Sequence, residues 1–94
     1  MAKRVIYTDK AFDDIDRIIE FHNLRNKSTT YSRKFLTGLK QRLQKLLKQP
    51  FSGRATDEPD ILVLIWDNFY VFYTPNGKGI EVLSVYHQKE NITP

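Results

Sequence analysis

The first half of the chain contains a short extended segment and then a long amphipathic pattern. Arg4 to Tyr7 is typical of a short strand, and Thr8 or Asp9 follows as a helix N-cap. From there apolar residues recur with helical spacing and share about one third of the helix circumference. This core-facing stripe consists of Ala11, Phe12, Ile15, Ile18, Ile19 and His22. The pattern predicts a helix that ends in the polar stretch from Asn23 to Lys27.

A second helical pattern follows after a short connection. Ser28 offers an N-cap, and the pattern continues to about Lys48. Its apolar arc consists of Phe35, Leu36, Leu39, Leu43, Leu46 and Leu47, with Ser32 small enough to lie inside it. Two amphipathic helices joined in this way can pack as a hairpin. Pro50 and Gly53 then end the helix and start a loop that runs to Pro59.

The remaining residues have the composition of β-strands. Two runs rich in β-branched and aromatic residues, from Ile61 to Trp66 and from Phe69 to Thr74, flank a two-residue turn and predict a hairpin. A second turn, from Pro75 to Gly79, leads into a third run that ends at His87. The element order is therefore βααβββ. It predicts an α+β domain whose helical hairpin packs on one face of a small, largely antiparallel sheet, with the other face free to bind.

Length and composition favour one folded domain over residues 1–94. The chain is 40% hydrophobic and 13% aromatic, unlike disordered segments, and no part of it resembles a linker. Its longest apolar run, from Ile61 to Trp66, is far shorter than the roughly 20 residues of a membrane-spanning helix. The N-terminus lacks the apolar segment of a signal peptide, so we expect a cytoplasmic protein with no membrane partner.

The residue types argue against a metal site. Cysteine is absent, which excludes disulfides, a thiol nucleophile and thiolate ligands. The two histidines stand far apart in the sequence and do not form a metal-binding cluster. We therefore expect a protein that works without a metal or another cofactor.

The charge distribution separates an acidic from a basic segment, within a net charge of +4. The five acidic residues before Asp57 all lie between Asp9 and Glu20. The following 36 positions contain no acid, and their basic residues are Arg25, Lys27, Arg33, Lys34, Lys40, Arg42, Lys45, Lys48 and Arg54. Such a block could attract nucleic acid or an acidic partner, or it could be a solvated helix face.

Six segments, in order and with matching spacing, resemble a known family. Tyr7 and the residues after it are similar to the family's opening strand and helix, and the leucine-rich arc is similar to its second helix. Pro50 to Arg54 resembles its Pro-x-x-Gly-Arg turn, Phe69 to Tyr73 its Tyr-Arg-x-x-Tyr strand, and Val82 to His87 its last strand. The family is the RelE/ParE superfamily of type II toxin-antitoxin toxins, in its plasmid-stabilisation branch. The resemblance covers nearly the whole chain.

The resemblance implies a toxin that inhibits the growth of a bacterial host until a cognate antitoxin binds it. RelE-like members cut messenger RNA in the ribosome, whereas ParE-like members bind DNA gyrase and show no nuclease chemistry. The partners to expect are therefore an antitoxin protein and either DNA gyrase or the ribosome with its mRNA. Both a homodimer and a hetero-oligomer with the antitoxin fit this picture.

The residues can be tested against the chemistry of RNA cleavage. Attack by a 2′-hydroxyl requires a base, donors or cations for the phosphate, and an acid for the leaving oxygen. In the family's ribonucleases these are mostly lysines and arginines on the second and third strands. Here the matching strand positions are Ile61, Val63 and Tyr70. The polar candidates that remain are Arg54, Tyr70, Tyr73, Tyr86, His87 and Lys89, with Gln88 near a C-terminal arginine position.

Each candidate also has a structural interpretation. His87 could be a general acid or base, since imidazole titrates near neutral pH, or a strand-end histidine packed beside Tyr86 or hydrogen-bonded to a loop. Tyr70 and Tyr73 could stack on bases or stabilise the sheet, and they fall on opposite faces of one strand. Arg54 could reach a phosphate or an acidic antitoxin segment, or be simply exposed. His22 is expected to be a packed core histidine.

Depletion of the nuclease cations favours a ParE-like toxin that acts by binding DNA gyrase. The alternative is a ribosome-dependent, metal-independent mRNA endonuclease that uses His87, Tyr70 and Arg54. A second alternative is a non-toxic basic module that holds nucleic acid through the second helix, or a decayed toxin. The candidates for binding an antitoxin or target are Arg54, Tyr73, Tyr86, Gln88 and Lys89.

Overall fold

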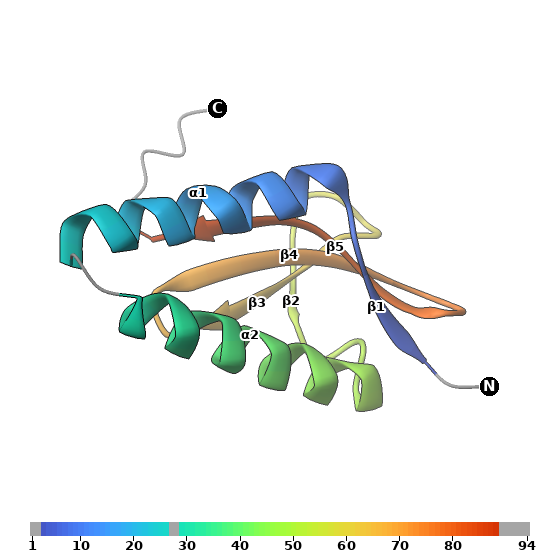
Figure 1. Ribbon diagram of the computed structural model, residues 1–94. Helices are drawn as coiled ribbons and strands as arrows, with labels where there is room; N and C mark the ends of the chain where they lie inside the picture. Colours follow the sequence, from blue (N-terminus) through green and yellow to red (C-terminus); the bar gives the residue numbers. More distant parts are fainter. Residues whose placement is uncertain (1–2, 27–28, 89–94) are drawn as a thin grey trace.

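The computed structural model describes residues 3–26 and 29–88, with side chains for residues 3–21 and 29–88. Its elements are, in chain order, β1 (Arg4–Tyr7), α1 (Asp9–Asn26), α2 (Thr30–Lys48), β2 (Arg54–Ala55), β3 (Leu62–Trp66), β4 (Phe69–Asn76) and β5 (Gly79–His87). Figure 1 shows α1 and α2 running antiparallel in front of the strands.

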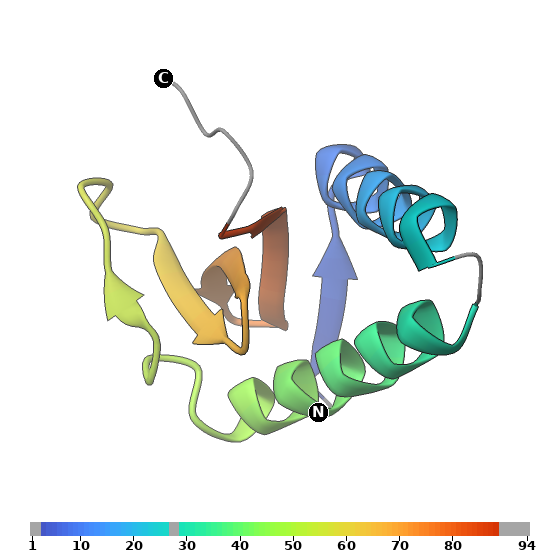
Figure 2. The same cartoon turned by 90° about the vertical axis from the view of Figure 1, so that its left-hand side faces the viewer.

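The five strands form one sheet in the order β1-β5-β4-β3-β2. All neighbouring strands are antiparallel except β1, which pairs parallel to the first half of β5. Both helices lie on the same side of this sheet (Figure 2). The predicted α+β architecture, with a helical hairpin on one face of a largely antiparallel sheet, is confirmed.

Alternation along the strands decides which face meets the helices. Phe69, Val71 and Tyr73 of β4 are buried and belong to the same hydrophobic cluster as the helix side chains. Tyr70 and Phe72 therefore point to the opposite face. We call this uncovered side the open face of the sheet.

The core lies between the helices and the sheet, and its buried residues come from α1, α2, β4 and β5. Its buried members are Ala11, Ile15, Ile18, Phe35, Leu39, Leu43, Leu46, Phe69, Val71, Tyr73, Ile80, Val82 and Val85. Phe35 of α2 contacts Phe69 of β4 with ring centroids 4.7 Å apart and stacks on Trp66 of β3 at 6.0 Å. The apolar arc of α2 and the buried Ser32 inside it are as predicted.

The boundaries of α1 agree with the prediction. Thr8 caps α1 as expected, because its Oγ1 accepts the Ala11 amide N–H at 3.1 Å. The expected helix end between Asn23 and Lys27 is confirmed, since α1 ends at Asn26. The predicted N-cap, Ser28, lies outside the described residues.

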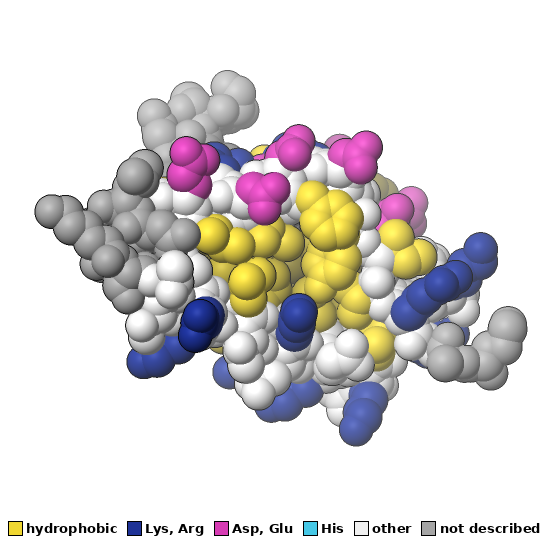
Figure 3. All heavy atoms as spheres, in the orientation of Figure 1, with side chains coloured by type: hydrophobic (Ala, Val, Ile, Leu, Met, Phe, Trp, Pro, Cys, Tyr) yellow, Lys and Arg dark blue, Asp and Glu magenta, His cyan; other side chains and the backbone are white. Residues whose placement is uncertain are grey.

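Phe12 does not belong to the core-facing stripe of α1. Its side chain is 53% exposed, with its ring centroid 5.2 Å from that of Tyr7. Phe12 follows the buried Ala11 and is turned from it by about 100° around the helix, so it lies at the edge of the buried stripe. Figure 3 shows hydrophobic side chains exposed between the two helices. The side chain of His22, which was expected to pack in the core, lies outside the described residues.

The segment after α2 contains a short strand that the sequence pattern did not predict. Arg54 and Ala55 form β2 and pair with Val63 and Leu62 of β3, so Arg54 lies on a strand and not in a loop. The two-residue turn before β4 is confirmed, and Asp67 adopts a positive φ of 53° there. The second turn is tighter than expected, because β4 continues through Pro75 to Asn76.

Candidate functional site: the open face of the sheet

Two cross-strand rows of side chains make up the centre of the open face. The first row runs from Arg54 of β2 through Val63 and Phe72 to Ser84 of β5. The second row contains Ile65, Tyr70 and Tyr86. Partners in a row point to the same side of the sheet, so the register alone places these side chains together. The surface they form is aromatic and aliphatic, with one cation at its edge.

The side chains of the open face are partly exposed and pack against one another. Ile65 is 48% exposed, and Tyr70, Phe72 and Tyr86 are half-buried. Phe72 packs edge-on against Tyr86 with ring centroids 6.0 Å apart. Such a surface offers apolar contact area and two hydroxyl groups, which suits recognition of another macromolecule.

Tyr86 is held by cations from α1. Lys10 Nζ donates a hydrogen bond to the Tyr86 hydroxyl at 2.8 Å and lies 4.6 Å from the ring centroid. The Arg17 guanidinium lies 5.7 Å from the same centroid. Both distances are within the range of cation–π attraction. Tyr86 therefore connects the open face to the first helix.

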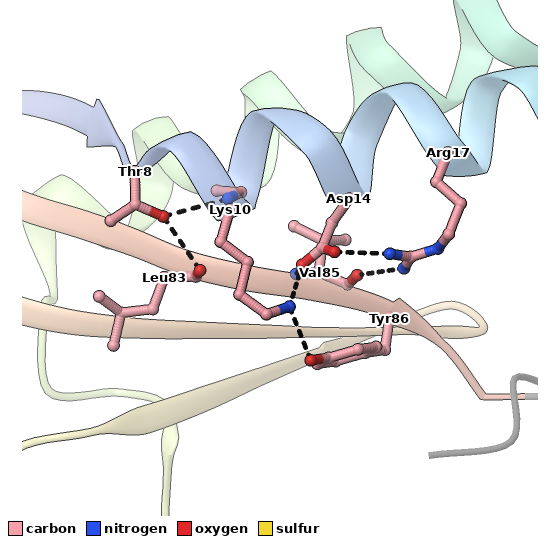
Figure 4. Close-up of polar contacts among 8 residues, drawn as sticks. Thr8, Lys10, Asp14, Arg17, Leu83, Val85 and Tyr86 are labelled. Carbon is pink, nitrogen blue, oxygen red and sulfur yellow. Dashed lines mark hydrogen bonds and ion pairs between the residues drawn. The ribbon is translucent and has the colours of Figure 1, made fainter. Parts of the chain in front are cut away.

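The same part of α1 covers the unpaired edge of β5. β1 pairs with β5 only as far as Val82, so beyond that residue β1 no longer covers this edge of β5. Thr8 Oγ1 donates to the Leu83 carbonyl at 3.0 Å, as Figure 4 shows. Asp14 Oδ2 accepts the Val85 amide at 3.0 Å, and Arg17 donates to the Val85 carbonyl at 3.1 Å.

Asp14 is the centre of this arrangement. Its side chain is buried, and it accepts hydrogen bonds from Lys10, Arg17 and the Val85 amide. Burial by itself raises the pKa of the Asp14 carboxyl, but the three hydrogen bonds outweigh burial and hold the pKa below its ordinary value. Asp14 is therefore ionised at neutral pH and does not serve as a proton donor there.

His87 does not join the other proposed catalytic residues. It pairs with Phe69 across β4 and β5, and its ring meets the Phe69 ring edge-on at 5.1 Å. Phe69 is a core residue under the helices, so His87 lies on the helix side of the sheet. Tyr70 and Arg54 lie on the open face. The structure does not bring these three side chains to one site, and His87 packs on Phe69 and not beside Tyr86.

Tyr73, a candidate for stacking and binding, is a structural residue. Its side chain is fully buried, and its hydroxyl donates to the Pro50 carbonyl at 2.8 Å and accepts the Gly53 amide at 3.0 Å. Burial raises the pKa of the Tyr73 hydroxyl, and the hydrogen bond from Gly53 opposes this rise only in part. Tyr73 thus fixes the turn that precedes Arg54 and cannot itself contact a partner in this fold.

The remaining candidates lie near the end of β5. Gln88 is exposed; its amide donates to the Asn68 carbonyl at 2.7 Å, and its side chain donates to Asn68 Oδ1 at 2.8 Å. It therefore joins the β3–β4 turn to the end of the sheet. Lys89 lies outside the described residues. Within residues 3–88, apart from the side chains left undescribed, no three His, Asp or Glu side chains gather as a metal-binding group.

Comparison with known families now identifies the kind of protein. A sequence model described as the ParE toxin of type II toxin-antitoxin systems, parDE, matches residues 5–92. The chain belongs to this family. The resemblance to the RelE/ParE superfamily noted in the sequence is therefore confirmed. A search of curated protein sequences gives no match.

Two solved structures have the fold of this ParE-type toxin. One comes from the chromosomal ParDE system of P. aeruginosa, with a TM-score of 0.73, 20% identity, and coverage of 90% of this chain and 95% of that chain. The other comes from the intact E. coli RelBE toxin-antitoxin complex, with a TM-score of 0.62, 16% identity, and coverage of 95% and 100%. At these identities the likeness shows the fold alone. No helix in the described part of the toxin is long and apolar enough to span a membrane.

The sequence patterns missed the group around Asp14 in this ParE-type toxin. Neither Asp14 nor Arg17 was among the candidate site residues. A signal was present, because Lys10, Asp14 and Arg17 follow the i, i+4 and i+3 spacing of helical ion pairs. What the spacing could not reveal is that the shared carboxylate also binds the edge of a strand far away in the sequence.

Proposed function

We propose that this ParE-type toxin arrests growth by binding DNA gyrase through the open face of its sheet, and that a cognate antitoxin neutralises it. The observation that carries the proposal is the separation of His87 from Tyr70 and Arg54 by the thickness of the sheet. A general acid or base must lie within hydrogen-bond reach of the reacting atoms, as must the groups that stabilise the phosphate. Binding has no such requirement.

The composition of the open face supports binding over cleavage. Ile65, Val63 and Phe72 are apolar, and Arg54 is the cation of the two central rows. Cleavage of RNA needs several polar groups around one phosphate, whereas protein interfaces are enriched in aromatic residues and arginine and are depleted in other charged side chains. A protein target such as gyrase fits this surface better than an RNA backbone.

The direct test uses the purified toxin with purified DNA gyrase, relaxed plasmid and ATP. We expect the toxin to inhibit supercoiling and to increase the amount of cleaved plasmid. Ile65→Lys places a charge in the centre of the open face and should weaken inhibition at least tenfold. Phe51→Lys is the matched control, because Phe51 is also an exposed apolar residue but lies outside the two central rows. It should inhibit like the wild type.

The same preparation tests the nuclease alternative. Translating ribosomes with a defined mRNA are incubated with the wild type and with His87→Phe, which keeps a ring against Phe69 but cannot transfer a proton. We expect intact mRNA with both proteins and full gyrase inhibition by His87→Phe. The proposal would be wrong if the wild type cleaved mRNA on ribosomes, His87→Phe did not, and neither protein inhibited gyrase. The nuclease alternative would then replace it.

A further inference from the structure

The side of α2 that points away from the core consists of basic and neutral polar side chains. At about 100° per residue these side chains lie opposite the buried stripe of the helix. Figure 3 shows basic side chains along the lower edge of the molecule, where Figure 1 places α2. We call this side the outer face of α2. Its exposed cations are Arg33, Lys34, Lys45 and Lys48, and its exposed neutral residues are Thr37, Gln41 and Gln44.

The positive charge of the outer face is not neutralised within the helix. α2 contains no aspartate and no glutamate. In the part of the chain whose side chains are described, the ion pairs join Lys10 and Arg17 to Asp14, all on α1, and none involves a cation of α2. An exposed helix that only needs to be soluble usually mixes both signs of charge. A surface of one sign attracts a partner of the opposite sign.

The residue types of the outer face match a nucleic-acid backbone better than an acidic protein. Protein interfaces have an apolar centre and are depleted in lysine. None of the large hydrophobic residues that stand exposed on the described surface belongs to α2. Phosphate oxygens, in contrast, are bound mainly by lysine and arginine together with hydroxyl and amide side chains. The outer face supplies those groups and lacks an exposed aromatic ring on which an unpaired base would stack.

We propose that the outer face of α2 binds the phosphate backbone of double-stranded DNA without reading its sequence. Arg33 and Lys34 form one group of cations, and Lys45 and Lys48 form a second group roughly 16 Å further along the helix. The major groove of DNA is about 12 Å wide, and these long side chains can span the difference. Each group therefore contacts one of the two strands that border a groove.

The choice of DNA among polyanions rests on the proposed gyrase target, since gyrase works on duplex DNA. Both helices lie on one side of the sheet, and the outer face of α2 points away from the sheet (Figure 2). The open face lies on the other side of the molecule. A toxin bound to gyrase through the open face thus keeps its outer face available for DNA.

The test measures DNA binding by the full-length toxin in the absence of gyrase. Fluorescence anisotropy follows a labelled duplex of about two helical turns at salt concentrations from about 50 to 200 mM. Four phosphate contacts predict that the logarithm of affinity falls with the logarithm of salt with a slope of about −3.6, which is a loss of about 100-fold over this range. Duplexes of different sequence should bind equally.

Neutral and charge-preserving variants locate the binding surface. The variant with Lys34→Gln, Lys45→Gln and Lys48→Gln should bind at least tenfold more weakly at low salt and reduce the steepness of the slope by about three. The same three positions changed to arginine should bind like the wild type. Lys45→Gln alone should reduce the steepness by about one, whereas Lys78→Gln, which removes an equal charge between β4 and β5, should not change it. Thermal unfolding of each variant checks the fold.

Ile65→Lys separates this proposal from the proposed function. It should lose gyrase inhibition and still bind DNA at least as well as the wild type, because Ile65 lies on the open face. Three results would overturn DNA binding by α2: no binding at low salt, an unchanged slope in the triple glutamine variant, or tighter binding to a polyglutamate peptide or to RNA than to the DNA duplex. A toxin that binds DNA through α2 but does not inhibit gyrase would refute the proposed function alone.

Discussion

At the scale of single residues, the buried carboxylate of Asp14 accepts a backbone hydrogen bond from β5 beyond the point where β1 stops pairing with it. Asp14 is 3% exposed, yet it is ionised because Lys10, Arg17 and the Val85 amide all donate to it. A buried charge destabilises a fold when it is unpaired, and here three donors satisfy its oxygens. The result is a fixed contact between α1 and β5 that also positions Tyr86.

Replacing Asp14 by asparagine should destabilise the toxin. The variant loses the charge that holds Lys10 and Arg17, and since both cations are about half exposed we expect a loss of about 2 kcal/mol in the free energy of unfolding. Asp13→Asn, one residue away and exposed, should change it by less than about 0.5 kcal/mol. Urea unfolding of the three proteins measures both values. Equal stability of Asp14→Asn and Asp13→Asn would refute the role given to Asp14.

The difference in stability between the wild type and Asp14→Asn should depend on pH, and the lowered pKa of Asp14 sets the direction of that dependence. The folded pKa of Asp14 is lowered, so its contribution is fully present above the unfolded value of about 4 and is lost as the pH falls through the folded pKa. The stability difference between the wild type and Asp14→Asn should therefore shrink as the pH is lowered below about 4. A difference that stays constant or grows on acidification would show that the carboxylate is not stabilised in this way.

Residue roles were the least predictable part of the sequence. Alternation correctly separated Tyr70 from Tyr73, but the sequence could not tell which of them faces the helices. That choice follows from the register of β4 with β3 and β5, a long-range property. The position of His87 on the helix side follows from the same register, so the proposed catalytic group of His87, Tyr70 and Arg54 could not be tested before the sheet was known.

At the scale of elements, local patterns predicted what local interactions determine. Sequence patterns predicted the apolar stripe of α2, the Thr8 cap and the β3–β4 hairpin, because each of these features depends on residues only a few positions apart. The two-residue strand β2 was not, since Arg54 and Ala55 are extended only through pairing with β3. The parallel pairing of β1 with β5 joins segments some 75 residues apart, and no local pattern reveals it.

The contact between α2 and β3 gives an element-scale prediction. A methyl group added at Gly38 would overlap the ring of Trp66, so α2 would have to move away from the sheet. Gly38→Ala should lower the free energy of unfolding by about 1–3 kcal/mol, although the same change in an exposed helix would stabilise it by about 1 kcal/mol. Gly77→Ala, which meets nothing nearby, is the control. Thermal unfolding in which Gly38→Ala melts at or above the wild-type temperature would contradict this packing.

At the scale of the whole molecule, the fold leaves two different surfaces for partners. The open face carries Ile65, Tyr70 and Tyr86, and exposed hydrophobic side chains, Phe12 among the exposed residues of α1, lie between the two helices (Figure 3). They lie on opposite sides of the sheet, so occupation of one surface does not cover the other.

The central claim, that this toxin acts by binding and not by cutting RNA, is tested most directly in growing cells. The wild type, His87→Phe and Ile65→Lys are expressed from an inducible promoter in a bacterial host, and growth, transcript integrity and DNA breaks are followed in each culture. We predict that the wild type and His87→Phe both arrest growth with intact transcripts and accumulating DNA breaks, and that Ile65→Lys does not. Cleaved transcripts in the wild type that disappear in His87→Phe would contradict the account.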